Sequence, residues 1–169
     1  MRAALVSCVL WSTLAFGAPP PPSPPAPDLA KLFSWVMGQW VADAKPGEPT
    51  GATSFEADLD GKVLVRRNEA NYPATNDKPA SSHHDLMVVS TAGDTVRATY
   101  WDNEGHTIAY AVVADAEKIV FTSDPAPGPR FRFTYGKKPD GKVSVLFEMA
   151  PPNAPDAFKK YVEGVLKRP

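Results

Sequence analysis

Two histidines and an aspartate stand directly ahead of an apolar segment in the stretch SSHHDLMVVS, residues 81–90. Imidazole and carboxylate groups exchange protons near neutral pH and bind metal ions, so this stretch is a first candidate for chemistry. Adjacent residues of a strand point to opposite faces, and His83 and His84 therefore cannot ligate the same ion from a regular strand. The chain has no His-x-His or helical His-x3-His spacing, so the pattern predicts no metal site and no cofactor.

Further polar side chains follow downstream, at Tyr100, Asp102 and His106. Asp102 with a histidine could act as a general acid–base pair if both reach a substrate proton. The chain contains no Gly-x-Ser-x-Gly motif and no glycine-rich phosphate loop ahead of a helix, so neither a serine hydrolase nor a P-loop enzyme is indicated. Whether these side chains meet depends on the elements that carry them.

Apolar and polar residues alternate through most of the chain, with turn signals between the alternating runs, as in half-buried strands. Turns that end at Gly93, Gly105 and Gly141 suit three-residue hairpin loops with a left-handed last residue. A meander of this length closes into a barrel, because closure removes its edges. We therefore predict an all-β antiparallel up-and-down barrel with strands near 39–44, 51–58, 62–71, 82–90, 95–102, 106–114, 118–123, 130–136 and 142–149.

A short helix is predicted at each end of this meander. In residues 28–37, Asp28 is a candidate N-cap, and one face collects Leu29, Leu32, Phe33 and Val36. Near the C-terminus, helical spacing again gives one apolar face, formed by Phe158, Tyr161, Val162 and Val165.

The hairpin loops also set which side chains face inward. If Ser90 pairs with Asp94 and Asp102 with His106, His84 lies inside beside Tyr100. A one-residue slip in the loop at 91–94 would bring His83 and Asp85 inside instead, and this strand alone does not exclude it. Pairing Lys138 with Lys142 places Phe131, Phe133 and Phe147 on the inner face, together with Tyr110 and Phe121 from earlier strands.

Arg66 and Arg67 are neighbours on the strand predicted at 62–71, so they face opposite ways. One of them is expected inside, where it could pair with an internal carboxylate or with an anionic ligand head. A solvated charged end of the barrel is the alternative.

The N-terminal segment predicts export. Residues 1–17 have the pattern of a secretory signal, with Arg2 first, an apolar run next and Ala15-Phe16-Gly17 as the cleavage site. The proline-rich residues 18–27 form a stiff linker, and residues 28–169 form one domain. A lipid anchor at Cys8 is disfavoured, because too few apolar residues precede it. We expect a periplasmic or extracellular monomer without a membrane span.

Composition excludes several other classes of function. Cys8 is the only cysteine, so the domain has no disulfide, thiolate nucleophile or cysteine metal ligand. The 18 basic and 19 acidic side chains are interspersed, and without a basic stripe nucleic acid is not an expected partner.

Gly38-Gln39-Trp40 follows the predicted N-terminal helix and opens the meander. In this motif and in its strand pattern the chain resembles the lipocalin-like (calycin) barrels, and among them the small exported bacterial proteins of unknown function. The resemblance implies that Trp40 closes the barrel floor beneath an arginine from a late strand, for which Arg130 and Arg132 are the candidates. A counterpart of the Thr-Asp-Tyr-type second lipocalin motif is absent from the sequence.

The leading hypothesis is an exported, non-enzymatic barrel that binds a small apolar or amphipathic molecule, since such sites have apolar walls with a few oriented polar groups. The expected ligand-binding residues are His84, Tyr100, Asp102, His106, Tyr110, Phe121, Phe131, Phe133 and Phe147. Three alternatives stay open. They are haem or metal binding through His84 or His106, an acid–base enzyme that uses the same polar row, and a partner-binding protein with a solid core.

Overall fold

The computed structural model describes residues 25–169. The predicted signal segment 1–17 and linker residues 18–24 lie outside the described residues. The described part is a closed antiparallel barrel in which every strand pairs with its neighbours in the chain and β1 pairs with β10. Its strands are β1 (Gly38–Ala42), β2 (Thr50–Asp58), β3 (Val63–Tyr72), β4 (Ser81–Ala92), β5 (Thr95–Asp102), β6 (Thr107–Ala114), β7 (Lys118–Ser123), β8 (Arg130–Lys137), β9 (Val143–Ala150) and β10 (Lys159–Lys167).

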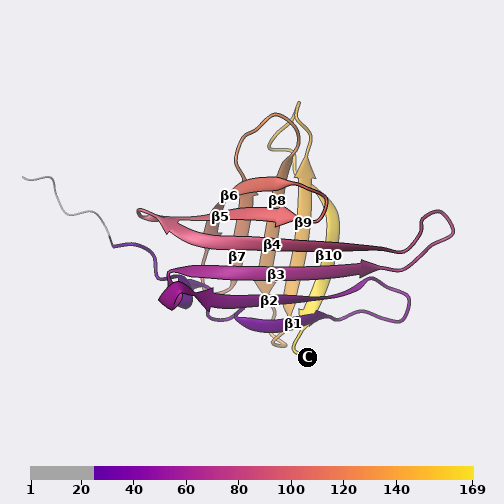
Figure 1. Ribbon diagram of the computed structural model, residues 1–169, viewed down its shortest axis with the longest axis horizontal. Helices are drawn as coiled ribbons and strands as arrows, with labels where there is room; N and C mark the ends of the chain where they lie inside the picture. Colours follow the sequence, from indigo (N-terminus) through magenta and orange to yellow (C-terminus); the bar gives the residue numbers. More distant parts are fainter. Residues whose placement is uncertain (1–24) are drawn as a thin grey trace, which may run out of the picture.

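The predicted all-β up-and-down barrel is thus confirmed. Figure 1 shows β1–β5 running crosswise in front of β7–β10, so the two halves of the barrel wall enclose one interior. Within residues 25–169, no helix has the length and apolar character that crossing a membrane would need.

Helices account for little of residues 25–169. Helix α1 spans only Leu29–Leu32, and Asp28 caps it by accepting a hydrogen bond from the Lys31 amide at 3.0 Å. A single 3-10 turn, η1 (Leu59–Gly61), connects β2 to β3. The C-terminal helix predicted from residues 158–165 is wrong, because this segment forms strand β10. Pairing β10 with both β9 and β1 closes the barrel and satisfies backbone groups that a helix would have left open at two sheet edges.

The registers predicted for β5–β6 and β8–β9 are confirmed, with Val96 opposite Val112 and Phe133 opposite Phe147. The register predicted for β4–β5 is wrong, since Ser90 pairs with Arg97 and not with Asp94. Strand β4 continues to Ala92, which pairs with Thr95 across a two-residue turn that begins at Gly93, φ 64°. Because the observed β4–β5 register differs from the predicted one by an odd number of residues, the side chains of β4 that were expected to face inward face outward, and the reverse.

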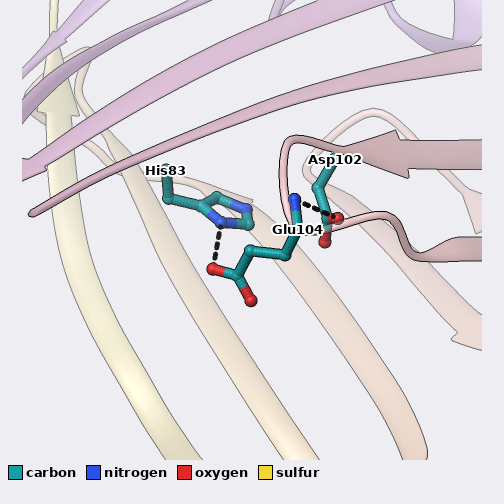
Figure 2. A group of neighbouring side chains, drawn as sticks. All are labelled: His83, Asp102 and Glu104. Atoms are coloured by element: carbon teal, nitrogen blue, oxygen red, sulfur yellow. Dashed lines mark hydrogen bonds and ion pairs between the residues drawn. The ribbon is translucent and has the colours of Figure 1, made fainter.

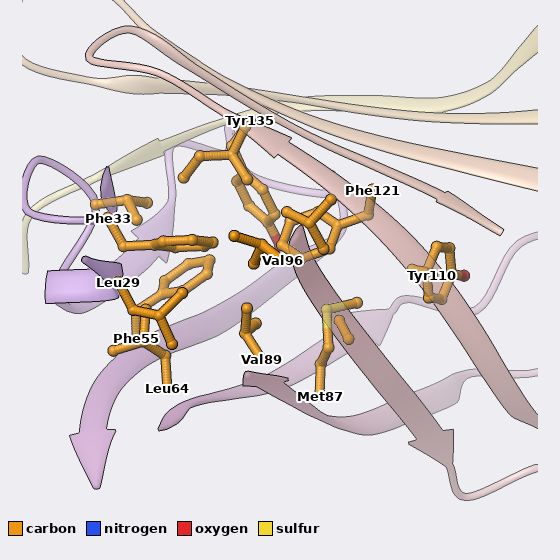
Figure 3. Close-up of a cluster of buried hydrophobic side chains, with 14 of the residues drawn as sticks. Leu29, Phe33, Phe55, Leu64, Met87, Val89, Val96, Tyr110, Phe121 and Tyr135 are labelled. Carbon is orange, nitrogen blue, oxygen red and sulfur yellow. The ribbon is translucent and has the colours of Figure 1, made fainter. Parts of the chain in front are cut away.

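The barrel end next to α1 is filled by apolar side chains. Phe33, Phe55 and Phe121 are fully buried there, and Phe55 meets Tyr135 edge to face with ring centroids 5.2 Å apart (Figure 3). Trp40 is also buried, and its indole Nε1 donates to the Val36 carbonyl at 2.6 Å. This end of the interior therefore has no room for a ligand.

Trp40 lies beneath an arginine, but not beneath either of the two expected. The guanidinium carbon of Arg168, just after β10, is 3.8 Å from the Trp40 ring centroid. Arg130 and Arg132 lie on the outer wall, where both guanidinium groups contact the Phe158 ring, at 5.8 and 4.3 Å. The expectation that Arg130 or Arg132 covers Trp40 is wrong, because the chain continues past β9 into a closing strand that brings Arg168 to the floor.

The seam between β1 and β10 is the shortest in the barrel, with only Val41 and Ala42 paired across it. Asp43 extends it by donating its amide to the Val165 carbonyl at 2.8 Å. Its carboxylate also accepts from Lys142 Nζ at 2.8 Å and contacts Lys167 Nζ at 2.9 Å. These two ammonium groups lower the pKa of Asp43 from 3.8 to about 2.

Asp43→Asn is expected to weaken the pH dependence of unfolding. A carboxyl whose pKa is lower in the folded state stabilises the fold above its unfolded pKa, and that stabilisation is lost as the pH falls through the folded pKa. The Asp43 contribution is therefore complete above about pH 4 and disappears towards about pH 2. Urea unfolding of both proteins between these pH values measures it. If the free energy of unfolding changes with pH equally in both proteins, the seam ion pairs of Asp43 contribute nothing to stability.

Candidate functional site

A buried ion pair lies in the middle of the barrel interior. The Arg66 side chain on β3 is 2% exposed and pairs with Asp85 on β4, whose side chain is 4% exposed. Asn68 donates to the other Asp85 oxygen at 3.0 Å and accepts from Thr53 Oγ1 at 2.5 Å. Arg66 faces inward because of strand alternation, since Leu64 and Arg66 on β3 lie on the same side as the buried Met87 and Val89 on β4.

A second polar group lies further toward the open end, on β4 and β5. His83 Nε2 is 2.9 Å from the Tyr100 hydroxyl, which donates to Asp102 Oδ2 at 3.1 Å. His83 Nε2 also lies 3.5 Å from Asp85 Oδ2, so the two polar groups are in contact. Burial, and then the negative charges of Asp85 and Asp102, raise the pKa of the Tyr100 hydroxyl and keep it a neutral donor.

The β5–β6 turn fixes Asp102 and brings Glu104 to His83. Asp102 Oδ1 accepts from the backbone amides of Glu104 and His106 at 3.0 and 2.9 Å, and Oδ2 lies 2.8 Å from His106 Nδ1. Burial raises the pKa of Asp102, but the hydrogen bonds from His106 and Tyr100 outweigh it and the net shift is downward. Asp102 is thus a buried, ionised carboxylate, and Glu104 Oε1 lies 3.2 Å from His83 Nδ1 beside it (Figure 2).

An aromatic wall on β8 and β9 also faces the interior. Phe131 stacks on Phe147 with centroids 5.9 Å apart, and Phe133 lies 5.4 Å from the same ring. All three rings are only half-buried, unlike the rings at the α1 end. On β10, Gly164 pairs with Val145 on the inner side, and a Cβ added to it would meet no atom within 4 Å. The interior at this end is therefore open.

The Arg66 guanidinium separates the filled half from the open half. Its carbon lies 5.1 Å from the Phe133 centroid and 5.7 Å from the Tyr135 centroid. Its Nε and the Tyr135 hydroxyl are both buried and form no hydrogen bond to any described residue.

The structure brings together part of the predicted site. Tyr100, Asp102 and His106 form one hydrogen-bonded group, and Phe131, Phe133 and Phe147 form the wall. Tyr110 and Phe121 face inward as expected but are packed edge to face within the core, with centroids 6.4 Å apart.

His84 does not belong to this group. Its side chain is exposed on the outer face, and its backbone amide and carbonyl bond to Asn103, donating to Oδ1 and accepting from the Asn103 amide, both at 3.0 Å. The inward placement predicted for His84 is wrong, and His83 takes that place because of the two-residue turn after β4.

Sequence reasoning from the chosen register missed His83, Asp85 and Glu104. The alternative, slipped register would have placed His83 and Asp85 inside. Arg66 was one of two expected candidates, because one of two neighbouring arginines on a strand must face inward. Glu104 had no signal, because its approach to His83 depends on how two hairpins lie side by side.

A hollow of about 700 Å³ crosses the outer face of β1–β5. Its outward-facing lining includes Arg67, Glu69, His84, Leu86 and Trp101. Arg67, Glu69 and His84 are exposed there. Asn68, Asp85 and Asp102 also border this hollow, although their side chains belong to the network on the other side of the wall. The interior, with its buried charges, is the better candidate for a site.

A search of protein-family models finds none that matches the chain, and a search of curated proteins finds no match either. The geometry of the interior therefore carries the functional argument.

Proposed function

We propose that the protein is an exported barrel that binds a small amphipathic molecule in the open half of its interior. The observation that carries the proposal is the contrast between the two ends. Inward-facing rings are fully buried near α1 but half-buried on the wall formed by Phe131, Phe133 and Phe147. An apolar surface that stays accessible inside a closed barrel is the usual lining of a small-molecule site.

Polar groups face the same space, so an amphipathic ligand would match this lining. His83, Tyr100 and Asp102 supply donors and acceptors on β4 and β5, across the interior from the aromatic wall on β8 and β9. Because Asp85 already neutralises Arg66, the ligand needs no negative charge to match the interior. A neutral or weakly polar head group with an apolar body fits this combination best.

The resemblance to lipocalin-like barrels supports the same proposal. The motif Gly38-Gln39-Trp40 places a buried tryptophan under an arginine at the closed end, as such barrels do. The predicted signal segment at residues 1–17 supports export, and hence capture of a molecule outside the cytoplasm.

Gly164→Phe is expected to weaken binding of a neutral, apolar fluorescent probe such as Nile red by at least about tenfold, which is about 1.4 kcal/mol. The new ring would occupy the space beside Val145 that is open in the parent protein, and the backbone at Gly164 is not in the left-handed region. Fluorescence titration measures the affinity, and native mass spectrometry of protein from its own host identifies a retained ligand.

Val113→Phe is the matched control, because Val113 is also on a strand but is 73% exposed on the outer wall. It should bind the probe as the parent protein does. If the parent protein binds no probe and carries no retained molecule, or if both variants bind equally well, the proposal is wrong.

A further inference from the structure

We propose that His83, Asp102 and Glu104 form a binding site for a divalent transition-metal ion at the open end of the barrel. The inference does not rest on the amphipathic ligand, because it uses different atoms and a different test. It departs from the expectation that the sequence contains no metal site.

The first support is the mutual distance of the donor atoms. One ligand atom from each of the three side chains lies within 4.8 Å of the other two. Zinc–nitrogen and zinc–oxygen bonds are about 2.0–2.2 Å long, so neighbouring ligands of a tetrahedral ion lie roughly 3.3–3.6 Å apart. His83 Nδ1 and Glu104 Oε1 are already close to this spacing, at 3.2 Å. Small rotations of side chains at the turn would complete the triangle seen in Figure 2.

The second support is the number of protons in the network. Tyr100 has a single hydroxyl proton, which it donates to Asp102 Oδ2. His83 Nε2 must therefore donate its proton to the Tyr100 oxygen. In a neutral imidazole this leaves Nδ1 with a lone pair, and that lone pair faces the Glu104 carboxylate. Two acceptors in contact repel each other, and a metal ion bound between them would relieve that repulsion.

The third support is the balance of charge. Arg66 neutralises Asp85, but within residues 25–169 neither Asp102 nor Glu104 forms an ion pair with a lysine or arginine. The Asp102 side chain is 4% exposed, and its negative charge is held by hydrogen bonds from Tyr100, His106 and two backbone amides and not by a lysine or arginine. One divalent ion would balance both carboxylates.

The surrounding hydrogen bonds are those that hold metal ligands in place. A ligating histidine usually donates its other ring N–H to a neighbouring oxygen, which fixes the tautomer. Tyr100 is that neighbour for His83, and it also holds Asp102. His106 holds Asp102 from the other side. We assign Tyr100 and His106 as positioning residues. The three ligands His83, Asp102 and Glu104 leave one coordination position of a tetrahedral ion free for water.

The test is calorimetric titration of the chelator-treated full chain, without a histidine tag, with Zn²⁺. We expect one ion per chain, and Co²⁺ should give the visible absorption bands of a low-coordinate nitrogen–oxygen site. Glu104→Gln should weaken Zn²⁺ binding by about 10–100-fold, and His83→Gln by more than about 100-fold. Glu104 is in an exposed turn, so its variant tests the site even if His83→Gln fails to fold.

His84→Gln is the matched control, because the neighbouring histidine is exposed on the outer face. It should bind Zn²⁺ as the parent protein does and show the same rise in melting temperature on adding the ion. Tyr100→Phe should weaken binding about tenfold and change the Co²⁺ spectrum, as expected of a positioning residue. The proposal is overturned if the parent protein does not saturate below millimolar Zn²⁺. It is also overturned if Glu104→Gln binds normally, or if His84→Gln loses as much affinity as His83→Gln.

Discussion

Asp85→Ala is expected to lower the free energy of unfolding by about 3–5 kcal/mol, among the largest effects of any single substitution in this barrel. Arg66 would then remain 2% exposed with no charge partner. Its contacts with the Phe133 and Tyr135 rings, at 5.1 and 5.7 Å, compensate only in part. Urea unfolding monitored by tryptophan fluorescence measures the loss.

The double variant Arg66→Met/Asp85→Leu is expected to recover most of this loss. Replacing a buried ion pair by apolar side chains of similar volume removes both desolvation costs together, whereas removing one partner leaves an unpaired charge. A double-mutant cycle separates the two effects.

Asp124→Ala is the matched control. Asp124 also pairs with an arginine, Arg97, but the two side chains are 40% and 35% exposed, so its loss should cost no more than about 1 kcal/mol. Similar losses for Asp85→Ala and Asp124→Ala would mean that the barrel interior is far better hydrated than the burial of Arg66 indicates.

Trp40→Ala is expected to cost about 3–5 kcal/mol. Trp40 is 2% exposed, and its removal would leave a cavity between the chain segment before β1 and the base of the barrel. It would also leave the Val36 carbonyl without its donor at 2.6 Å and Arg168 without the ring beneath it. Thermal and urea unfolding give the magnitude.

Two further variants divide this effect into its parts. Trp40→Phe keeps a ring but loses the indole donor, so it should cost less than Trp40→Ala, and its cost should include about 1–3 kcal/mol for the unpaired Val36 carbonyl. Trp101→Ala is the surface comparison, because Trp101 is 40% exposed on the outer wall. A Trp101→Ala loss as large as that of Trp40→Ala would show that the floor has no special role.

Most of the architecture was predictable from local patterns. Alternating polarity and glycine turns located nine of the strands to within a few residues. The register of β8–β9 followed from one turn, because Lys138 and Lys142 flank a glycine that needs a left-handed backbone. The buried role of Trp40 was what the resemblance to lipocalin-like barrels implied for the Gly38-Gln39-Trp40 motif after the first helix. These features depend on neighbours in the chain, which is why sequence alone determines them.

The C-terminal strand was misassigned for a physical reason. In residues 158–167 the apolar side chains follow helical spacing more closely than strict alternation. The bulge between Lys160 and Val162 breaks the strict alternation that would have marked a strand. Only the presence of two unpaired edges, on β9 and β1, decides in favour of β10.

Tertiary structure alone decided what faces the interior at the candidate site. Leu86, Met87, Val88 and Val89 are all apolar, so hydrophobic pattern could not choose between the two faces of β4. The choice follows from pairing β4 with β3, which places Asp85 next to Arg66 inside the barrel. The two-residue turn at Gly93 fixes the same register between β4 and β5, and so it places the same side chains of β4 inside. The sequence thus determined that histidine, aspartate and arginine lie on these strands. Which of them meet was determined by pairing between hairpins, because a one-residue change in a turn reverses every side chain of a strand without changing its composition.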